Sequence, residues 1–298
     1  MKVLNEVFLR WPSLFFTMAM AMAMAWSSSG SAAPGLVKKG EYIFNAAGCA
    51  GCHTSAKPKG APLAGGRTLK TPFGVFVTPN ISPDRDTGIG GWDEADFVRA
   101  MREGRSPDGV YYFPAFPYVS YAGMTDADLV ALWAYLRSRP AQSRPNRAHE
   151  ITFPFNQRWL LFFWRFLYFD GTPYAPDPVK SAAWNRGAYL VRSVGHCGEC
   201  HTPRSILGGM RLDREFAGAA KGPEGKRVAN ITPHNPKGIG AWSQQDIVSF
   251  LSDGFLPDGD YVGGAMTEVV ENSTSRMTRD DLQAIAIFLS SAPKHTDP

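Results

Sequence analysis

Cysteine is scarce in this chain, whose 298 residues contain only four, at positions 49, 52, 197 and 200. All four fall into two copies of one short pattern. None therefore remains for a separate disulfide or for an additional zinc site made of thiolates. The chemistry of the cysteines must belong to these two patterns.

Strong charge and long apolar runs are missing as well. The formal net charge of +4 predicts neither a nucleic-acid partner nor a strongly acidic one. The most aromatic stretch, residues 151–169, is not a membrane span, because a helix over 159–169 would reach only about 16 Å and Arg158 and Arg165 interrupt it. The sequence shows no dinucleotide-binding loop and no further metal cluster, so nothing in it indicates a catalytic domain.

What the chain does contain is the pattern Cys-x-x-Cys-His, twice. The two copies are Cys49, Cys52 and His53, and Cys197, Cys200 and His201. A lone Cys-x-x-Cys could be a redox dithiol or half a zinc site. A histidine directly after it, in both copies, favours covalent attachment of haem c. The thiols would add to the haem vinyl groups as thioethers, and each histidine would be the proximal iron ligand.

Residues 1–33 have the pattern of a bacterial export signal. Lys2 and Arg10 precede an apolar run from Leu14 to Trp26, and small residues follow up to Ala33. This order is typical of a cleaved signal peptide, and the apolar run is shorter than the roughly 20 residues that a spanning anchor needs. An uncleaved anchor is the alternative. We expect the mature protein in the periplasm, at most held at the outer face of the inner membrane.

The remaining chain repeats itself, which predicts two haem domains, residues 34–140 and 183–298, joined by a linker, 141–182. Five pairs of segments carry the repeat: 39–44 and 186–191, 80–83 and 230–233, 88–92 and 238–242, 106–109 and 256–259, and 124–129 and 277–282. The expected fold is all-α, as in two tandem class I cytochrome c domains.

Caps and periodicity place the last helix of each domain after Thr125 and after Thr278. Glycine normally weakens a helix interior by about 1 kcal/mol relative to alanine, yet Gly40 and Gly187 lie within the helices that lead into the two motifs. In class I cytochromes c, which these segments resemble, the first and last helices cross at such a glycine against an aromatic residue. Tyr135 and Phe288 are the matching candidates, while the alternative is that both glycines merely start their helices.

A methionine on the far side of the iron makes a low-spin electron carrier of raised potential, whereas an open position allows ligand binding. In the second half, Met266 lies 65 residues after His201, in the loop before the cap Thr278. We expect it to be the sixth ligand of the second haem. The competing interpretation is a packing methionine.

The first half has Phe116 at the corresponding place, and a phenyl ring cannot bind iron. Met101 belongs to an apolar helix face, so Met124 is the candidate ligand of the first haem. Packing at the start of the helix, or an open or water-ligated iron, are the alternatives. His149, His196, His234 and His295 have no spacing that favours them over the methionines.

The linker has prolines at both ends and aromatic residues between them, at 151–169. We interpret this run as a helix that packs on both haem domains. The alternative is that this run docks onto a dehydrogenase subunit or onto the membrane surface. In the second case the protein would be a peripheral membrane protein.

Taken together, the two motifs, the Asn-Ile-Ser/Thr-Pro turns, residues 114–118 and residues 264–270 resemble the cytochrome c subunits of bacterial membrane-bound alcohol and gluconate dehydrogenases. Many of those carry methionine where this chain has Phe116 and possess a third haem domain, so this chain looks like a dihaem relative. The resemblance implies electron relay from a dehydrogenase to a quinone, an oxidase or another cytochrome.

An electron carrier rather than an enzyme is therefore expected, because the haem itself performs one-electron chemistry. The alternative is a dihaem peroxidase-like enzyme that uses an open first haem. Thiosulfate oxidation at a haem with a cysteine ligand is disfavoured, since no cysteine is spare.

The first prediction is that each chain binds two haems covalently, because each motif supplies both thiols and the histidine. Haem should stay with the denatured protein after acid–acetone extraction, and the pyridine haemochrome spectrum should give a stoichiometry of about two. A stoichiometry of about one would contradict it.

Overall fold

The computed structural model describes residues 34–55, 60–222 and 225–297, so the expected signal peptide, residues 1–33, lies outside the described part. The first half of the described chain contains α1 (Pro34–Ala46), α2 (Cys49–His53), β1 (Thr68–Thr71), β2 (Gly74–Val77), α3 (Glu94–Glu103), α4 (Tyr118–Tyr121) and α5 (Asp126–Arg137). The linker contributes β3 (Glu150–Ile151) and α6 (Leu160–Tyr168).

The second half contains α7 (Ala182–Tyr189), a π-helical turn η1 (Leu190–Val194), α8 (Gly198–His201) and a 3-10 turn η2 (Leu212–Arg214). It continues with α9 (Gln244–Asp253), α10 (Ala265–Asn272), a 3-10 turn η4 (Thr274–Arg276) and α11 (Arg279–Ser290). Among the described residues, no helix is both long and apolar enough to cross a membrane.

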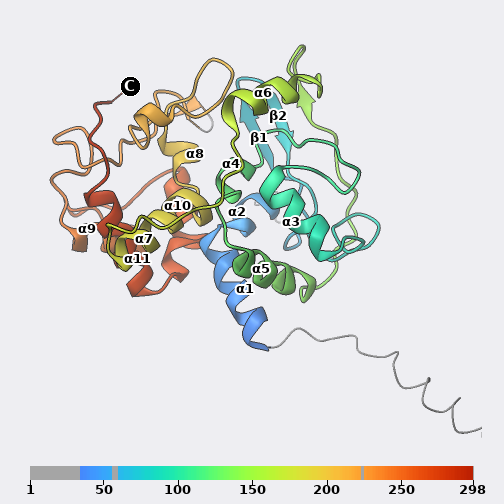
Figure 1. Ribbon diagram of the computed structural model, residues 1–298, viewed down its shortest axis with the longest axis horizontal. Coiled ribbons are helices and arrows are strands. Elements are labelled where there is room, and N and C mark those ends of the chain that lie inside the picture. Colours follow the sequence, from blue (N-terminus) through green and yellow to red (C-terminus); the bar gives the residue numbers. More distant parts are fainter. Residues whose placement is uncertain (1–33, 56–59, 223–224, 298) are drawn as a thin grey trace, which may run out of the picture. The chain divides into compact units, whose positions relative to one another are not determined.

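The predicted glycine crossings are confirmed, since α1 crosses α5 and α7 crosses α11 (Figure 1). A Cβ atom added to Gly40 would lie 1.9 Å from the carbonyl oxygen of Ala131 and 2.7 Å from the Cβ atom of Tyr135. At Gly187 the Cβ atom of Phe288 would be 2.9 Å away. Both glycines lie inside their helices, so the alternative that they only start them is wrong.

The helix starts expected at Thr125 and Thr278 are confirmed too. Each threonine side chain accepts a hydrogen bond from the backbone N–H of the third residue after it, Asp128 and Asp281 respectively. Such a cap satisfies one of the free N–H groups at the helix start and contributes about 1 kcal/mol.

The described fold is mostly helical, but it departs from the all-α expectation in one place. A small antiparallel sheet of order β1-β2-β3 places Gly74 opposite Ile151 and Val75 opposite Glu150. Thr71 and Gly74 close the turn between β1 and β2, where the Thr71 hydroxyl donates to the Gly74 carbonyl at 2.9 Å. The runs are four residues or shorter, which is too short for alternation to separate strand from loop.

Of the run 151–169 that was expected to be helical, only α6 forms a helix, and it contacts both halves. Leu161 is buried beside Phe76 and Phe113, and the Trp164 indole donates to the carbonyl oxygen of Leu207 at 2.9 Å. The opposite side of the helix is exposed, and Phe166 retains 84% of its accessible surface.

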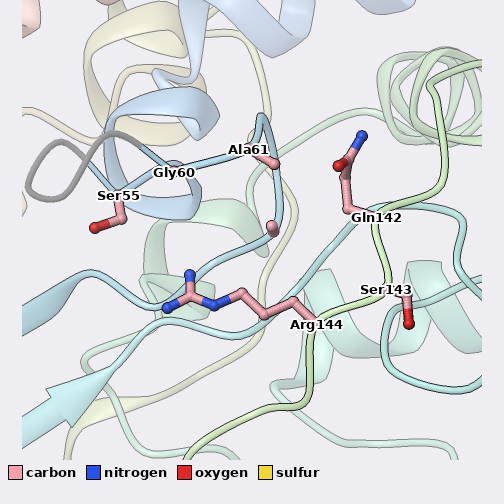
Figure 2. Close-up of a pocket in the computed structure, with 7 residues that line it drawn as sticks. Ser55, Gly60, Ala61, Gln142, Ser143 and Arg144 are labelled. Carbon is pink, nitrogen blue, oxygen red and sulfur yellow. The ribbon is translucent and has the colours of Figure 1, made fainter.

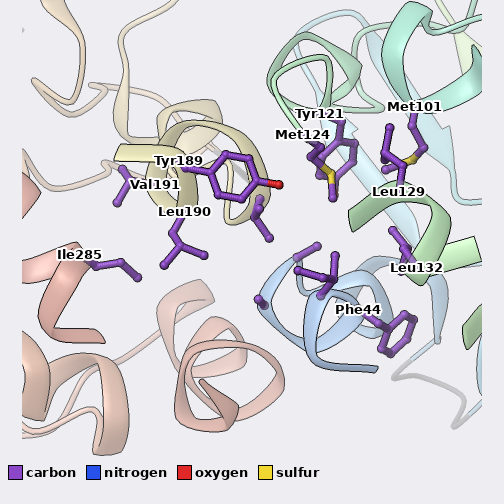
Figure 3. Packing of buried hydrophobic residues seen from close by; sticks show 14 of the residues in the cluster. Phe44, Met101, Tyr121, Met124, Leu129, Leu132, Tyr189, Leu190, Val191 and Ile285 are labelled. Atoms are coloured by element: carbon purple, nitrogen blue, oxygen red, sulfur yellow. The ribbon is translucent and has the colours of Figure 1, made fainter. Parts of the chain in front are cut away.

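One apolar cluster runs through both halves and joins α1, α5, α7 and α11 (Figure 3). Next to it, two tyrosines reach across from one half to the other. The Tyr189 hydroxyl donates to Asp128 Oδ2 at 2.5 Å, and the Tyr42 hydroxyl donates to Asp281. Tyr42 and Tyr189 occupy equivalent places in the repeat, so the exchange is reciprocal.

Each of these carboxylates also pairs with a base of its own half. Lys39 lies 2.8 Å from Asp128, and Arg186 lies 2.7 Å from Asp281. Burial alone would raise the pKa of Asp281, but hydrogen bonds from Arg186 and Tyr42 outweigh burial and lower the pKa. The carboxylate is thus ionised at neutral pH, as a buried charge with partners should be.

The second prediction is that Gly40→Ala lowers the free energy of unfolding by about 1–3 kcal/mol, the usual effect of overpacking. The added methyl group would collide with the α5 backbone at Ala131. Gly35→Ala, in the same helix but with nothing within 4 Å, is the control and should change stability by less than about 1 kcal/mol. Thermal or denaturant unfolding followed by circular dichroism measures both, and equal effects would argue against the crossing.

Candidate haem-attachment sites

The first motif is one short helix directly after α1. The chain turns at Gly48, which has φ 62°, and α2 then carries Cys49, Cys52 and His53. Residues three and four apart on a helix share a face, so the two sulfur atoms and the imidazole project from one side of α2. This is the arrangement that a haem needs if it is to be attached at one edge and ligated at its iron.

The second motif is built in the same way but is reached differently. The π-helical turn η1 follows α7 and ends at Gly195, and His196 then adopts φ 42°. Cys197 precedes α8, which holds Cys200 and His201. A π-helical turn adds a residue to the helical ladder and changes the direction of the next segment, which here turns the chain into the motif.

Both motif histidines are oriented by the same kind of hydrogen bond. His53 Nδ1 lies 2.8 Å from the carbonyl oxygen of Pro79, and His201 Nδ1 lies 2.8 Å from that of Ala229. A carbonyl oxygen can only accept, so Nδ1 carries the proton and Nε2 keeps the lone pair that binds a metal. Burial lowers the pKa of both imidazoles, which keeps them in the neutral form required of a ligand.

The thiols do not fit a redox dithiol. All four cysteines are free, and burial raises the pKa of Cys49 and of Cys197 to about 12. A reactive dithiol needs the opposite shift. Thiols on one helical face with an oriented neutral imidazole do fit haem c, which Cys49, Cys52 and His53 would hold in one half and Cys197, Cys200 and His201 in the other. Attached there, the haem would supply one-electron chemistry at its iron.

The carbonyl groups that orient the histidines are fixed by the repeated asparagines. Asn80 Oδ1 accepts from the Ser82 N–H at 2.9 Å, and Asn230 Oδ1 accepts from the Thr232 N–H at 2.8 Å. Each of these asparagines directly follows the residue whose carbonyl oxygen meets a motif histidine. The sequence showed that these asparagines are repeated but not what they do, because only the folded chain places the preceding carbonyl group beside the imidazole.

Asn80 and Asn230 are fixed in turn by segments that follow the last helix of their half. Asn80 Nδ2 donates to the carbonyl oxygen of Gln142 at 2.6 Å, and Asn230 Nδ2 donates to that of His295 at 2.7 Å. Gln142 and Arg144 also line a cavity of about 380 Å³ with Ser55 and Ala61, beside the first motif (Figure 2). The start of the linker thus supports the first site from outside.

Met266 lies in the first turn of α10, rather than in the loop that the sequence indicated. Gly264, with φ 67°, starts this helix, and the residues after it contain no proline to prevent it. Met266 is partly exposed, and α10 contacts both α9 and α2.

Met124 lies after α4 and is fully buried in the large apolar cluster, beside Tyr121 (Figure 3). Its repeat partner Met277 is only partly buried. Phe116 is also partly buried, with its ring 5.8 Å from that of Tyr121. Pro114 and Pro117 flank it, which explains why this segment forms only the short α4 where the second half has α10.

Three of the other histidines make structural contacts, whereas the buried Nδ1 of the fourth, His234, has no hydrogen-bond partner among the described residues. His149 Nδ1 accepts from the Val77 N–H at 3.1 Å beside the small sheet, and His295 contributes its carbonyl oxygen to Asn230. His196, which directly precedes Cys197, packs against the first half. No group of three or more His, Cys, Asp or Glu within 34–55, 60–222 and 225–297 could hold a metal ion.

Comparison with known proteins agrees with this geometry. A family model for cytochrome c matches residues 37–140. A protein of Cereibacter sphaeroides called diheme cytochrome c-type is 44% identical over 263 residues, which cover 87% of this chain and 86% of that protein. The chain belongs to the cytochrome c family.

Two further relatives of this cytochrome are subunits of larger enzymes. The gluconate 2-dehydrogenase cytochrome c subunit of Pantoea cypripedii is 39% identical over 264 residues, covering 86% of this chain. The cytochrome c subunit of a quinone-dependent alcohol dehydrogenase of Gluconobacter oxydans is 37% identical over 265 residues, covering 87%. The cytochrome spans only 59% and 55% of these two relatives.

The third prediction concerns Met266. Met266→Ala should convert the iron at the second motif to high spin and lower its potential, because a thioether stabilises ferrous iron more than water does. In the proton spectrum of the reduced protein, the upfield-shifted methyl signal of one bound methionine should vanish. Met277→Ala, at the start of α11, is the control and should leave the spectrum unchanged. A low-spin second site in Met266→Ala would contradict the assignment.

Proposed function

We propose that this cytochrome carries two haems in two class I domains, residues 34–140 and 183–298, joined by the linker 141–182. The observation that carries the proposal is the repeated ligand geometry. In each half, a free Cys-x-x-Cys pair precedes a histidine whose Nδ1 lies 2.8 Å from a carbonyl oxygen, just before a fixed asparagine. Packing alone does not require the same hydrogen bond twice.

The proposed function is to pass electrons one at a time from a dehydrogenase to the respiratory chain. The haem supplies the change between ferric and ferrous iron. The chain's own residues hold each imidazole neutral and oriented, and keep the attachment thiols together on one helix. The relatives named as cytochrome subunits of gluconate and alcohol dehydrogenases support a dehydrogenase as donor. A quinone, another cytochrome or an oxidase is the proposed acceptor.

We place the protein in the periplasm, possessing a cleaved signal peptide at residues 1–33, on the strength of the charge and apolar pattern there. The sixth ligands are proposed to be Met266 for the second haem and Met124 for the first. Complete burial of Met124 supports this choice, since its repeat partner Met277 stays partly buried. A bound methionine on both irons would close them to small ligands and suit electron transfer.

The relay is tested in membranes of a strain that lacks this gene. Oxygen uptake driven by the substrate of one dehydrogenase, with gluconate and ethanol tried first, should fall by about tenfold or more if the electron path is cut. The purified dihaem protein should restore it, and protein stripped of iron should not. Normal uptake with every substrate in the deleted strain would refute the relay.

The fourth prediction addresses the first haem. Reduced wild-type protein should bind little CO, whereas Met124→Leu should bind about one CO per chain, because leucine keeps the volume of the buried side chain and removes the sulfur ligand. Absorption difference spectra under CO measure this.

The matched control is Met101→Leu, which makes the same substitution at another buried methionine of the first half and should not open the iron. Phe116→Leu should also leave the spin state intact. If wild-type protein already binds CO at one haem and consumes hydrogen peroxide with an electron donor, the carrier function fails and a peroxidase-like function replaces it.

A further inference from the structure

His196 and Tyr121 connect segments that adjoin the two haem-attachment motifs. His196 directly precedes Cys197 of the second motif, and its Nε2 donates to the carbonyl oxygen of Ala47, two residues before Cys49, at 3.3 Å. The edge of one ring meets the face of the other between His196 and Tyr121, with centroids 5.4 Å apart and planes at 85°. A residue of each half is thus clamped at the attachment motif of the other.

Tyr121 is positioned to do this for both motifs at once. It is a buried residue of α4, in the first half. Cys49 of the first motif and Cys197 of the second both pack against the apolar cluster that contains Tyr121.

Polar contacts across the same boundary brace the interior of both motifs. The Ser120 hydroxyl donates to Glu199 Oε1 at 2.8 Å, inside the second motif. On the other side, Arg67 Nη1 lies 2.6 Å from the carbonyl oxygen of Gly51, inside the first motif, and 2.6 Å from Glu268 Oε2 of α10. The second motif is therefore contacted by the segment just before Met124, the candidate sixth ligand in the first half. The first motif is contacted, through Arg67, by α10, which carries Met266, the candidate sixth ligand in the second half.

The backbone at His196 shows that this contact is specific to the second motif. Its φ of 42° lies in the left-handed region, where non-glycine residues are uncommon. The equivalent residue of the first motif is Gly48, with φ 62°, for which this conformation is unstrained. A residue stays in such an unfavourable backbone conformation where contacts with its surroundings hold it there. The contacts with Ala47 and Tyr121 are such surroundings.

We propose that His196 and Tyr121 are positioning residues that lock the two attachment motifs together, so that the two haems exchange electrons directly within one chain. The proposal rests on the dihaem relay proposed above. In the exchange, the ferrous iron of one haem loses one electron and the ferric iron of the other gains it, and no bond forms or breaks. Neither side chain has to be oxidised or to change its protonation.

The test uses the mature dihaem protein with four substitutions. His196→Gly installs the residue of the first motif and relieves the backbone, so the variant should fold. Tyr121→Leu removes the ring, and Tyr121→Phe keeps it. Phe250→Leu is the matched control, since it breaks an edge-to-face pair with Trp242 at the same 5.4 Å separation, in α9.

Two readouts report on the lock. The paired positive and negative Soret bands in circular dichroism depend on the relative orientation of the haems, and a rapid pulse of a one-electron reductant followed by absorption gives the rate of internal exchange. In His196→Gly and Tyr121→Leu the paired bands should weaken and the rate should fall by about tenfold or more, because small misplacements have large effects on rates. Tyr121→Phe and Phe250→Leu should stay within about twofold of the wild type.

Wild-type dichroism and exchange rates in both His196→Gly and Tyr121→Leu would overturn the positioning role and leave the relay intact. A wild-type protein with two haems that do not exchange electrons would overturn the inference as well, whereas one haem per chain would refute the dihaem protein on which it rests. Haem stoichiometry and thermal unfolding of every variant separate these results from a failure to fold.

Discussion

The exchange of hydrogen bonds between two tyrosines and two aspartates is the constraint on which the rest of the structure depends. Tyr189 donates to Asp128 of the other half, and Tyr42 donates to Asp281. Both carboxylates lie in the first turn of the last helix of their half, where the helix dipole favours negative charge. If the halves moved apart, each carboxylate would keep the base of its own half but lose the tyrosine of the other, so the exchange favours the paired arrangement.

This constraint fixes the motifs as well as the helices. Tyr42 lies in α1 shortly before the first motif, and Tyr189 ends α7 just before the turn η1 that leads into the second. Because α1, α5, α7 and α11 are held together, α1 and η1 both end at the contact between the two halves. The contact between His196 and Tyr121 lies at that boundary and adds to the reciprocal exchange.

Local signals allowed part of this to be predicted. The caps at Thr125 and Thr278 and the glycines at the helix crossings can be inferred from spacing alone, because a cap or a crossing depends on residues a few positions apart. The sheet could not, since Gly74 pairs with Ile151 across more than seventy residues. The role of Asn80 was equally hidden, because the histidine it serves is found only in the folded chain.

The halves differ most where they face each other, and the contacts explain why. In the first half, α4 contacts η1 of the second, while α10 of the second half contacts α2 of the first. Each of these segments lies beside the candidate site of its own half. It also packs against an element of the other half that its repeat partner does not contact. Gly48 has become His196 at one such place, and Phe116 stands where the second half has Met266. A duplicated fold can keep its helix crossings and its reciprocal tyrosine–aspartate contacts identical, but it cannot keep α4 and α10 identical, because these two segments meet different neighbours. Divergence at these positions therefore follows from the different neighbours that the two halves meet.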